Sequence, residues 1–163
     1  MSRGTPVDPL PHLAAVARAL AAHGQPAPAF AALDRALAAA LGHKLFTILR
    51  WHPDRAESER LYTSQPAAYP VGGRKPLNAT AWSRQVLDER RPYIGRTADD
   101  IRAHFFDHAL IASLGCDSIL NIPVVWNDRV LGTLNLLHEA HWYDDADVPL
   151  ASTFAALAAA AMR

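Results

Sequence analysis

The stretch that decides the fold runs from Gly115 to Leu136 and reads GCDSILNIPVVWNDRVLGTLNL. Two apolar runs, 118–126 and 129–138, lie on either side of Asn127-Asp128. An Asn-Asp pair between such runs favours a tight turn, so the sequence predicts an antiparallel hairpin. Pro123 predicts an edge or a bulge in the first of these strands, because proline has no N–H to donate to a ladder.

A second hairpin is predicted upstream. Residues 44–51 and 57–64 alternate between apolar and polar side chains, and His52-Pro53-Asp54 punctuates the chain between them. Residues 65–76 then bring three prolines and two glycines. This composition predicts a long irregular loop, of the kind that often covers a functional site.

Helices are predicted before and after the hairpins. Helical spacing of apolar residues indicates two alanine-rich helices, 9–22 and 29–41, and a final helix that begins at Asp144 or Asp145 and runs through Ala161. Strands joined as hairpins, with helices gathered around them, indicate the α+β class with an antiparallel sheet rather than a parallel one.

Two further helices are predicted between the hairpins. Asn78 is positioned to cap a helix that carries Trp82, and a short extended piece, 92–94, follows it. Thr97 and Asp100 have the spacing of a capping box, and they predict one helix that continues to Gly115.

Composition limits the class of protein. We expect a single domain over residues 1–163, with helices in 1–42 and the sheet, pocket elements and last helix in 43–163. The 16 basic and 16 acidic side chains cancel, which argues against a nucleic-acid partner. No apolar run reaches the roughly 20 residues of a membrane span. One cysteine and no secretory leader make a cytoplasmic location the expectation.

The hairpin of residues 115–136, with the helix and proline of residues 82–92 before it, resembles the GAF domain family. The resemblance covers nearly the whole chain. It implies a six-stranded antiparallel sheet with helices on one face, often packed into a dimer, and a loop-covered pocket on the other face. Family members bind cyclic nucleotides, tetrapyrroles or other small molecules, or have no known ligand. The resemblance therefore implies a fold rather than a ligand.

Several family activities do not fit this sequence. The Asn-Lys-Phe-Asp-Glu signature of the cyclic-nucleotide binders is absent. The methionine sulfoxide reductases of the family need several cysteines, whereas this chain has only Cys116. A covalently attached chromophore needs a thiol that faces the pocket. Cys116 instead begins a predicted strand just after the helix stop at Gly115, so we expect no such chromophore. The sequence identifies no cofactor.

Pocket residues are predicted from the implied fold. Aromatic side chains would supply walls, and a few polar groups would orient a ligand. The candidates are Tyr62, Ser64, Tyr69, Arg74, Lys75, Trp82, Phe105, Asp107, His108, Asn121 and Asn135. Each also has a structural alternative: Tyr62 and Trp82 as core aromatics, and the two asparagines as partners of each other across the hairpin.

Catalytic and metal sites receive little support from the sequence. His104 and His108 are four residues apart on a predicted helix, but the glutamate of a zinc-protease motif is missing. No serine lies in a nucleophile-elbow pattern, and Asp117 beside Cys116 would raise the pKa of that thiol. The predicted function is therefore a non-enzymatic sensory or regulatory domain that binds a small molecule. The alternatives are a small enzyme that uses Asp107, His108 and Asn121, and a domain that only dimerises.

Two partners are predicted. The first is a small anionic effector, held between the loop 72–75 and walls formed by Tyr62, Trp82, His108 and Asn121. The second is another copy of the chain, since the alanine-rich helices 9–22 and 29–41, with help from 151–162, lack strongly polar faces.

Overall fold

Six strands form one antiparallel sheet in the computed structural model, which describes residues 3–163. They are β1 (Leu45–His52), β2 (Glu57–Thr63), β3 (Arg74–Pro76), β4 (Tyr93–Gly95), β5 (Ser118–Trp126) and β6 (Arg129–His138). The order across the sheet is β3-β2-β1-β6-β5-β4. Both predicted hairpins are present, and β1 pairs with β6 to join them at the centre of the sheet. The α+β class and the six-stranded antiparallel sheet are confirmed.

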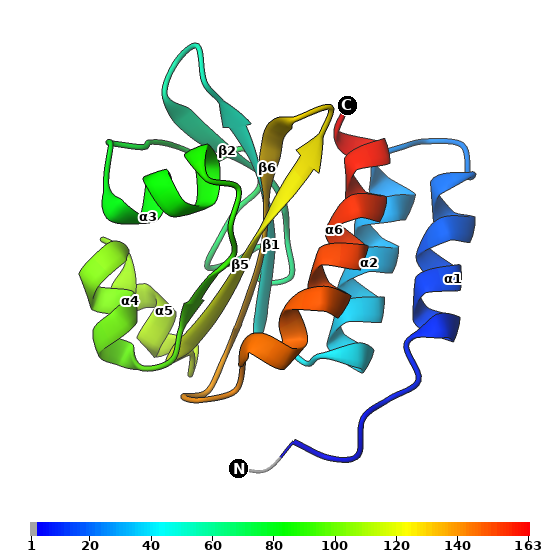
Figure 1. Cartoon of the computed structure of the whole chain (residues 1–163), viewed down its shortest axis with the longest axis horizontal. Coiled ribbons are helices and arrows are strands. Elements are labelled where there is room, and N and C mark those ends of the chain that lie inside the picture. The colour runs from blue at the N-terminus through cyan, green and yellow to red at the C-terminus, as the bar shows by residue number, and fades with distance from the viewer. Residues whose placement is uncertain (1–2) are drawn as a thin grey trace.

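Two helices, α2 (Ala27–Ala40) and α6 (Val148–Met162), cover one face of the sheet, and α1 (Leu10–Leu20) packs against them on the side away from the sheet (Figure 1). A short 3-10 turn, η2 (Asp145–Asp147), leads into α6. Alternate residues of the central strands, such as Phe46 and Ile48 of β1, pack against these helices and are fully buried. The alternation of the strands thus directs one set of side chains into the main core and leaves the other set for the opposite face.

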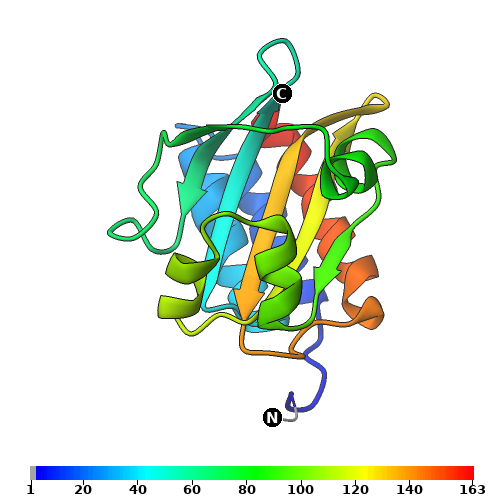
Figure 2. The ribbon, with the colours of Figure 1, turned by 90° about the vertical axis from the view of Figure 1, so that its left-hand side faces the viewer.

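Shorter elements cover the opposite face, where α4 (Ala98–His104) and α5 (His108–Ser113) lie in front of the sheet (Figure 2). A one-turn α3 (Ala81–Ser83) continues directly into a π-helical turn, η1 (Arg84–Asp88). The segment that carries β3 crosses above these elements. This face therefore carries a roof of short helices and extended chain rather than a packed helical layer.

The structure corrects three local predictions. Residues 65–76 do not stay irregular to their end, because residues 74–76 form β3 and pair with β2. The helix predicted from Asn78 begins instead at the cap Thr80, whose hydroxyl accepts the Ser83 N–H. The single helix predicted from Thr97 to Gly115 is two helices, because the backbone is extended at Phe105, with φ −126° and ψ 119°. The capping box of Thr97 and Asp100 is present.

A β-bulge in β2 decides which of its side chains face the roof. Arg60 lies opposite Leu49 and Tyr62 lies opposite Ile48, so Leu61 has no partner on β1. This extra residue places Arg60 and Tyr62 on opposite faces, although they are two apart in sequence. A second bulge follows Pro123, which lies where β5 pairs with β6 alone, as the proline predicts.

Among the described residues, no helix has both the length and the apolar character to cross a membrane.

Candidate functional site

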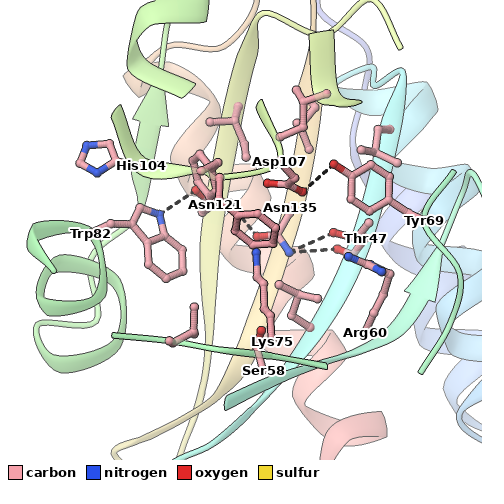
Figure 3. A pocket seen from close by; sticks show the side chains of 18 of the residues that line it. Thr47, Ser58, Arg60, Tyr69, Lys75, Trp82, His104, Asp107, Asn121 and Asn135 are labelled. Carbon is pink, nitrogen blue, oxygen red and sulfur yellow. Dashed lines mark hydrogen bonds between the residues drawn. The ribbon is translucent and has the colours of Figure 1, made fainter. Parts of the chain in front are cut away.

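A cavity of about 210 Å³ lies between the sheet and its roof (Figure 3). Its floor is the roof-facing side of the central strands, which carries Thr47, Leu49, Asn121 and Asn135 among others. Its walls and roof come from residues 69–82 and from the break between α4 and α5. The extended backbone at Phe105 is what brings consecutive roof side chains to this space, because a continuous helix would place them on different sides.

A chain of buried hydrogen bonds crosses the floor. The Trp82 indole N–H donates to Asn121 Oδ1 over 3.0 Å, and Asn121 Nδ2 donates to Asn135 Oδ1 over 2.7 Å. Asn135 Nδ2 in turn donates to Thr47 Oγ1 over 3.2 Å. Asn121 and Asn135 are direct partners in the β5–β6 register, and Asn135 faces Thr47 across β1–β6. The two asparagines therefore do pair across the hairpin, and their row ties the roof to the sheet.

Charged side chains gather at the other end of the cavity. The Asp107 Oδ2 atom accepts the Tyr69 hydroxyl over 2.6 Å, and the Arg60 guanidinium carbon lies 4.6 Å from the centre of the Tyr69 ring. The Lys75 ammonium lies 5.5 Å from the centre of the Phe106 ring. Within residues 3–163, no carboxylate lies close enough to Lys75 or Arg60 to form an ion pair. Two cations thus face the cavity with only partial compensation from Asp107.

Three buried polar atoms at this end have no hydrogen-bond partner among the described residues. They are Ser58 Oγ, Arg60 Nε and Asp107 Oδ1. A buried polar atom without a partner costs free energy of about 1–3 kcal/mol, so such atoms are rare in native proteins. Their concentration beside one cavity indicates a place that can receive hydrogen bonds from a bound molecule.

Burial changes the protonation of the groups here. Burial lowers the pKa of Lys75, while the nearby Asp107 carboxylate opposes the shift and Arg60 adds to it. The pKa of the Tyr69 hydroxyl is raised well above its ordinary value, chiefly by burial and also by its hydrogen bond to Asp107. Tyr69 therefore stays a hydrogen-bond donor, and the Asp107 oxygen that it contacts is an acceptor.

Seven of the eleven predicted pocket residues line the cavity: Tyr69, Lys75, Trp82, Phe105, Asp107, Asn121 and Asn135. They come from β3, β5, β6, the loop before β3, α3 and the break between α4 and α5, so the fold brings together residues up to 66 positions apart (69 to 135).

Tyr62 and Ser64 do not line the cavity. The bulge at Leu61 turns the Tyr62 side chain to the helix side of the sheet. The Tyr62 side chain packs beside Phe46 on the helix side, where its hydroxyl donates to Asp34 over 2.5 Å. The Ser64 hydroxyl accepts the Phe46 N–H and so closes the end of the β1–β2 pairing. Tyr62 therefore ties β2 to α2, and Ser64 ties the end of β2 to β1.

Arg74 and His108 also lie outside the cavity. Arg74 is bound to Glu57 at 2.5 Å and to Glu59 at 3.2 Å, and it borders an outer hollow of about 120 Å³ that adjoins the cavity. His108 lines a separate hollow with Cys116, beneath α4 and α5. The cluster of Asp107, His108 and Asn121 proposed for an enzyme is therefore not assembled in one space.

The sequence prediction missed several lining residues, of which Ser58, Arg60, His104 and Phe106 are the most consequential. Ser58 and Arg60 lie on the predicted strand before the bulge, whereas the candidates on that strand, Tyr62 and Ser64, come after it. His104 and Phe106 were obscured by the prediction of one continuous helix. Among the described residues, no group of three or more His, Cys, Asp or Glu side chains could hold a metal ion.

Solved structures with the same fold come from several kinds of protein. A GAF domain of a phosphoenolpyruvate-protein phosphotransferase from Coxiella burnetii matches with a TM-score of 0.78 at 18% identity, covering 97% of this chain and 94% of that one. The corresponding domain from Acinetobacter matches with a TM-score of 0.76 at 14% identity, covering 99% and 94%. A phycocyanobilin-bound GAF domain of a cyanobacterial phytochrome matches with a TM-score of 0.73 at 14% identity, covering 95% and 93%.

These identities are low enough that the likeness shows the fold alone. A chemotaxis-protein domain is also similar, with a TM-score of 0.66 at 18% identity, covering 92% of this chain and 93% of that one. GAF domains of this kind thus occur in signalling proteins. Among curated protein sequences, none matches the chain. The model of the GAF domain family matches residues 29–163, which span both hairpins, the roof and α6, and the chain therefore belongs to the GAF domain family.

Proposed function

We propose that this chain is a sensory domain that binds a small polar molecule in the cavity between the sheet and its roof. The observation that carries the proposal is the group of three unpartnered buried polar atoms, on Ser58, Arg60 and Asp107, beside a cavity with an apolar end. Burying these atoms without partners costs free energy, and a ligand that pairs them would offset this cost.

The cavity and the helical layer share the central strands, which supports a sensory role. In β1, Thr47 faces the cavity, while its neighbours Phe46 and Ile48 pack against the helices. A ligand that shifts β1 or β6 therefore changes the packing on the opposite face of the sheet. The signal would then leave through α1, α2 and α6, to a second copy of the chain or to a separate partner.

The experiment is native mass spectrometry of the purified protein, followed by a thermal-shift screen of small metabolites and calorimetry of every compound that raises the melting temperature. Saturable binding without turnover supports the proposal. Chemical conversion of the bound compound would favour an enzyme, and absence of binding by every compound would favour a domain that only dimerises. Leu49→Trp fills the cavity floor and is expected to abolish binding while the protein remains folded.

A homodimer through the helical layer is part of the proposal. A charge at Leu37 of α2 would disrupt folding rather than association, because this side chain is fully buried inside the subunit. Ala156 of α6 and Ala38 of α2 are exposed on this layer and suit the test. Ala156→Glu is expected to convert a dimer to a monomer in light scattering without lowering the melting temperature, whereas a wild-type protein that is monomeric at micromolar concentration would contradict a dimer.

A further inference from the structure

We infer that the ligand of this cavity is a small carboxylic acid with a hydrogen-bond donor next to the carboxylate, as in a 2-amino or 2-hydroxy acid, and with an apolar remainder. The inference rests on the proposed function and assigns a chemical class to the same site. It follows from the size of the cavity, from the charges at its polar end and from the side chains at its other end.

Size sets the first limit. The volume of about 210 Å³ is below the range of roughly 300–1,000 Å³ that is usual for drug-sized ligands. A cavity of about 150 Å³ in another protein holds one benzene ring, so the present one suits about eight to ten non-hydrogen atoms. Amino acids and hydroxy acids of middle size have this number of atoms, whereas nucleotides and tetrapyrroles have far more.

Charge sets the second limit. Four side chains border both the cavity and the outer hollow: Ser58, Arg60, Lys75 and Asp107. The polar group of the ligand therefore lies where the two spaces meet. With Arg60 and Lys75 positive and Asp107 negative, the junction carries one excess positive charge. A carboxylate is the group that compensates this charge, and it accepts hydrogen bonds from the free Arg60 Nε–H, the Lys75 ammonium and the Ser58 hydroxyl.

Asp107 adds the requirement for a donor. Its Oδ2 atom is occupied by the Tyr69 hydroxyl, but its buried Oδ1 atom has no partner within residues 3–163. An ionised carboxylate can only accept hydrogen bonds, so the ligand must donate to it. A simple carboxylate without a donor would leave Oδ1 unpaired and would place two negative groups close together. A hydroxyl beside the ligand carboxylate removes the first cost, and an ammonium removes both.

The opposite end of the cavity is apolar. Trp82 and Phe105 meet edge to face with ring centres 6.0 Å apart, and Ile111, Ile119 and Leu137 complete the wall. These side chains have no polar atom to offer apart from the Trp82 N–H, which Asn121 already accepts. An aliphatic or aromatic ligand side chain is therefore the part that fits here.

The test begins with a thermal-shift screen of the twenty amino acids and their 2-hydroxy analogues, and calorimetry then gives the affinity of the tightest binder. Two analogues of that binder are compared with it: the amine or alcohol that lacks the carboxylate, and the acid that lacks the neighbouring donor. Each loss is expected to weaken binding about tenfold or more, as for a lost charge-assisted hydrogen bond. Equal affinity for either analogue would overturn the inference.

Three variants locate the contacts. Arg60→Met keeps the apolar stem and is expected to weaken binding about ten- to a hundredfold. Arg74→Met is the matched control, because Arg74 is bound by Glu57 and Glu59 outside the cavity and its loss should leave affinity unchanged. Asp107→Asn retains an acceptor for the Tyr69 hydroxyl. It should weaken the binding of an amino acid more than that of a hydroxy acid, which shows whether the ligand donates through an ammonium or a hydroxyl.

Melting temperatures of all variants, measured without ligand, exclude misfolding as the cause of weaker binding. If neutral or purely cationic molecules saturate the site and Leu49→Trp blocks them, the chemical class is wrong and the proposed function stands. If no compound binds and native mass spectrometry finds none, both are refuted.

Discussion

Replacing Asn121 with alanine is expected to lower the free energy of unfolding by about 2–4 kcal/mol. The substitution removes the acceptor of the Trp82 indole N–H and the donor to Asn135 Oδ1, which are both buried. Each unpaired buried group costs about 1–3 kcal/mol, and the lower half of the summed range applies because water in the adjacent cavity can reach part of the gap. For a domain of this length, the loss corresponds to a drop in melting temperature of about 5–15 °C.

Thermal and urea unfolding measure this loss, and a double-mutant cycle with Trp82→Phe isolates the indole contact. Because Trp82→Phe removes the N–H, the later loss of Asn121 should cost less in that background, by about 1 kcal/mol. Asn78→Ala is the control, since Asn78 is an exposed amide at the cavity rim without a side-chain hydrogen bond in the described part of the chain. An Asn121→Ala protein that melts within about 2 °C of the wild type would refute the reasoning.

Three further outcomes test other parts of the fold. Gly132→Ala should prevent folding or lower the melting temperature by about 10 °C or more, because the added Cβ would lie 1.9 Å from the Leu49 carbonyl oxygen on β1; normal melting would contradict this packing. Cys116 should not react with a thiol reagent at pH 8 until urea unfolds the protein, because the thiol is buried and burial raises its pKa to about 11; rapid reaction of the native protein would be inconsistent with its position. Burial lowers the pKa of His138 below 6.5 in the folded protein, although Glu139 opposes the shift. Between that lowered pKa and 6.5 the unfolded chain binds more protons than the folded one, so the free energy of unfolding should fall as the pH falls through this range. The midpoint of urea unfolding should drop less with pH in His138→Gln, and equal pH dependence of the two proteins would exclude His138 as the cause.

The elements that sequence predicted best are those whose signals are local. The turn Asn127-Asp128 and the alternation on either side of it suffice for the β5–β6 hairpin, and the box of Thr97 and Asp100 suffices for the start of α4. The pairing of Asn121 with Asn135 was one of two predicted alternatives, because an amide in an apolar strand requires a partner. These predictions depend on neighbours in sequence or on one hairpin register.

The elements that sequence missed depend on distant contacts. The three residues of β3 become a strand because β2 offers an edge there. The helix breaks at Phe105, where the ring meets Trp82 from another segment, although helical spacing continues through the break. Arg74 was predicted to bind an anion because it lies beside glycines and a second cation in a loop. The sequence does not show that Glu57 and Glu59 of β2 bind Arg74 and leave Arg60 as the arginine at the cavity.

The bulge at Leu61 also bears on which changes in length β2 can accept. Because Leu61 lacks a partner, removing this one residue would leave Arg60 against Leu49 and Tyr62 against Ile48, with no other pairing altered. Without Leu61, Arg60 and Tyr62 would be consecutive in a regular ladder, facing the cavity and the helices as they do now. A chain that lacks residue 61 can therefore keep Arg60 on the same wall of the cavity.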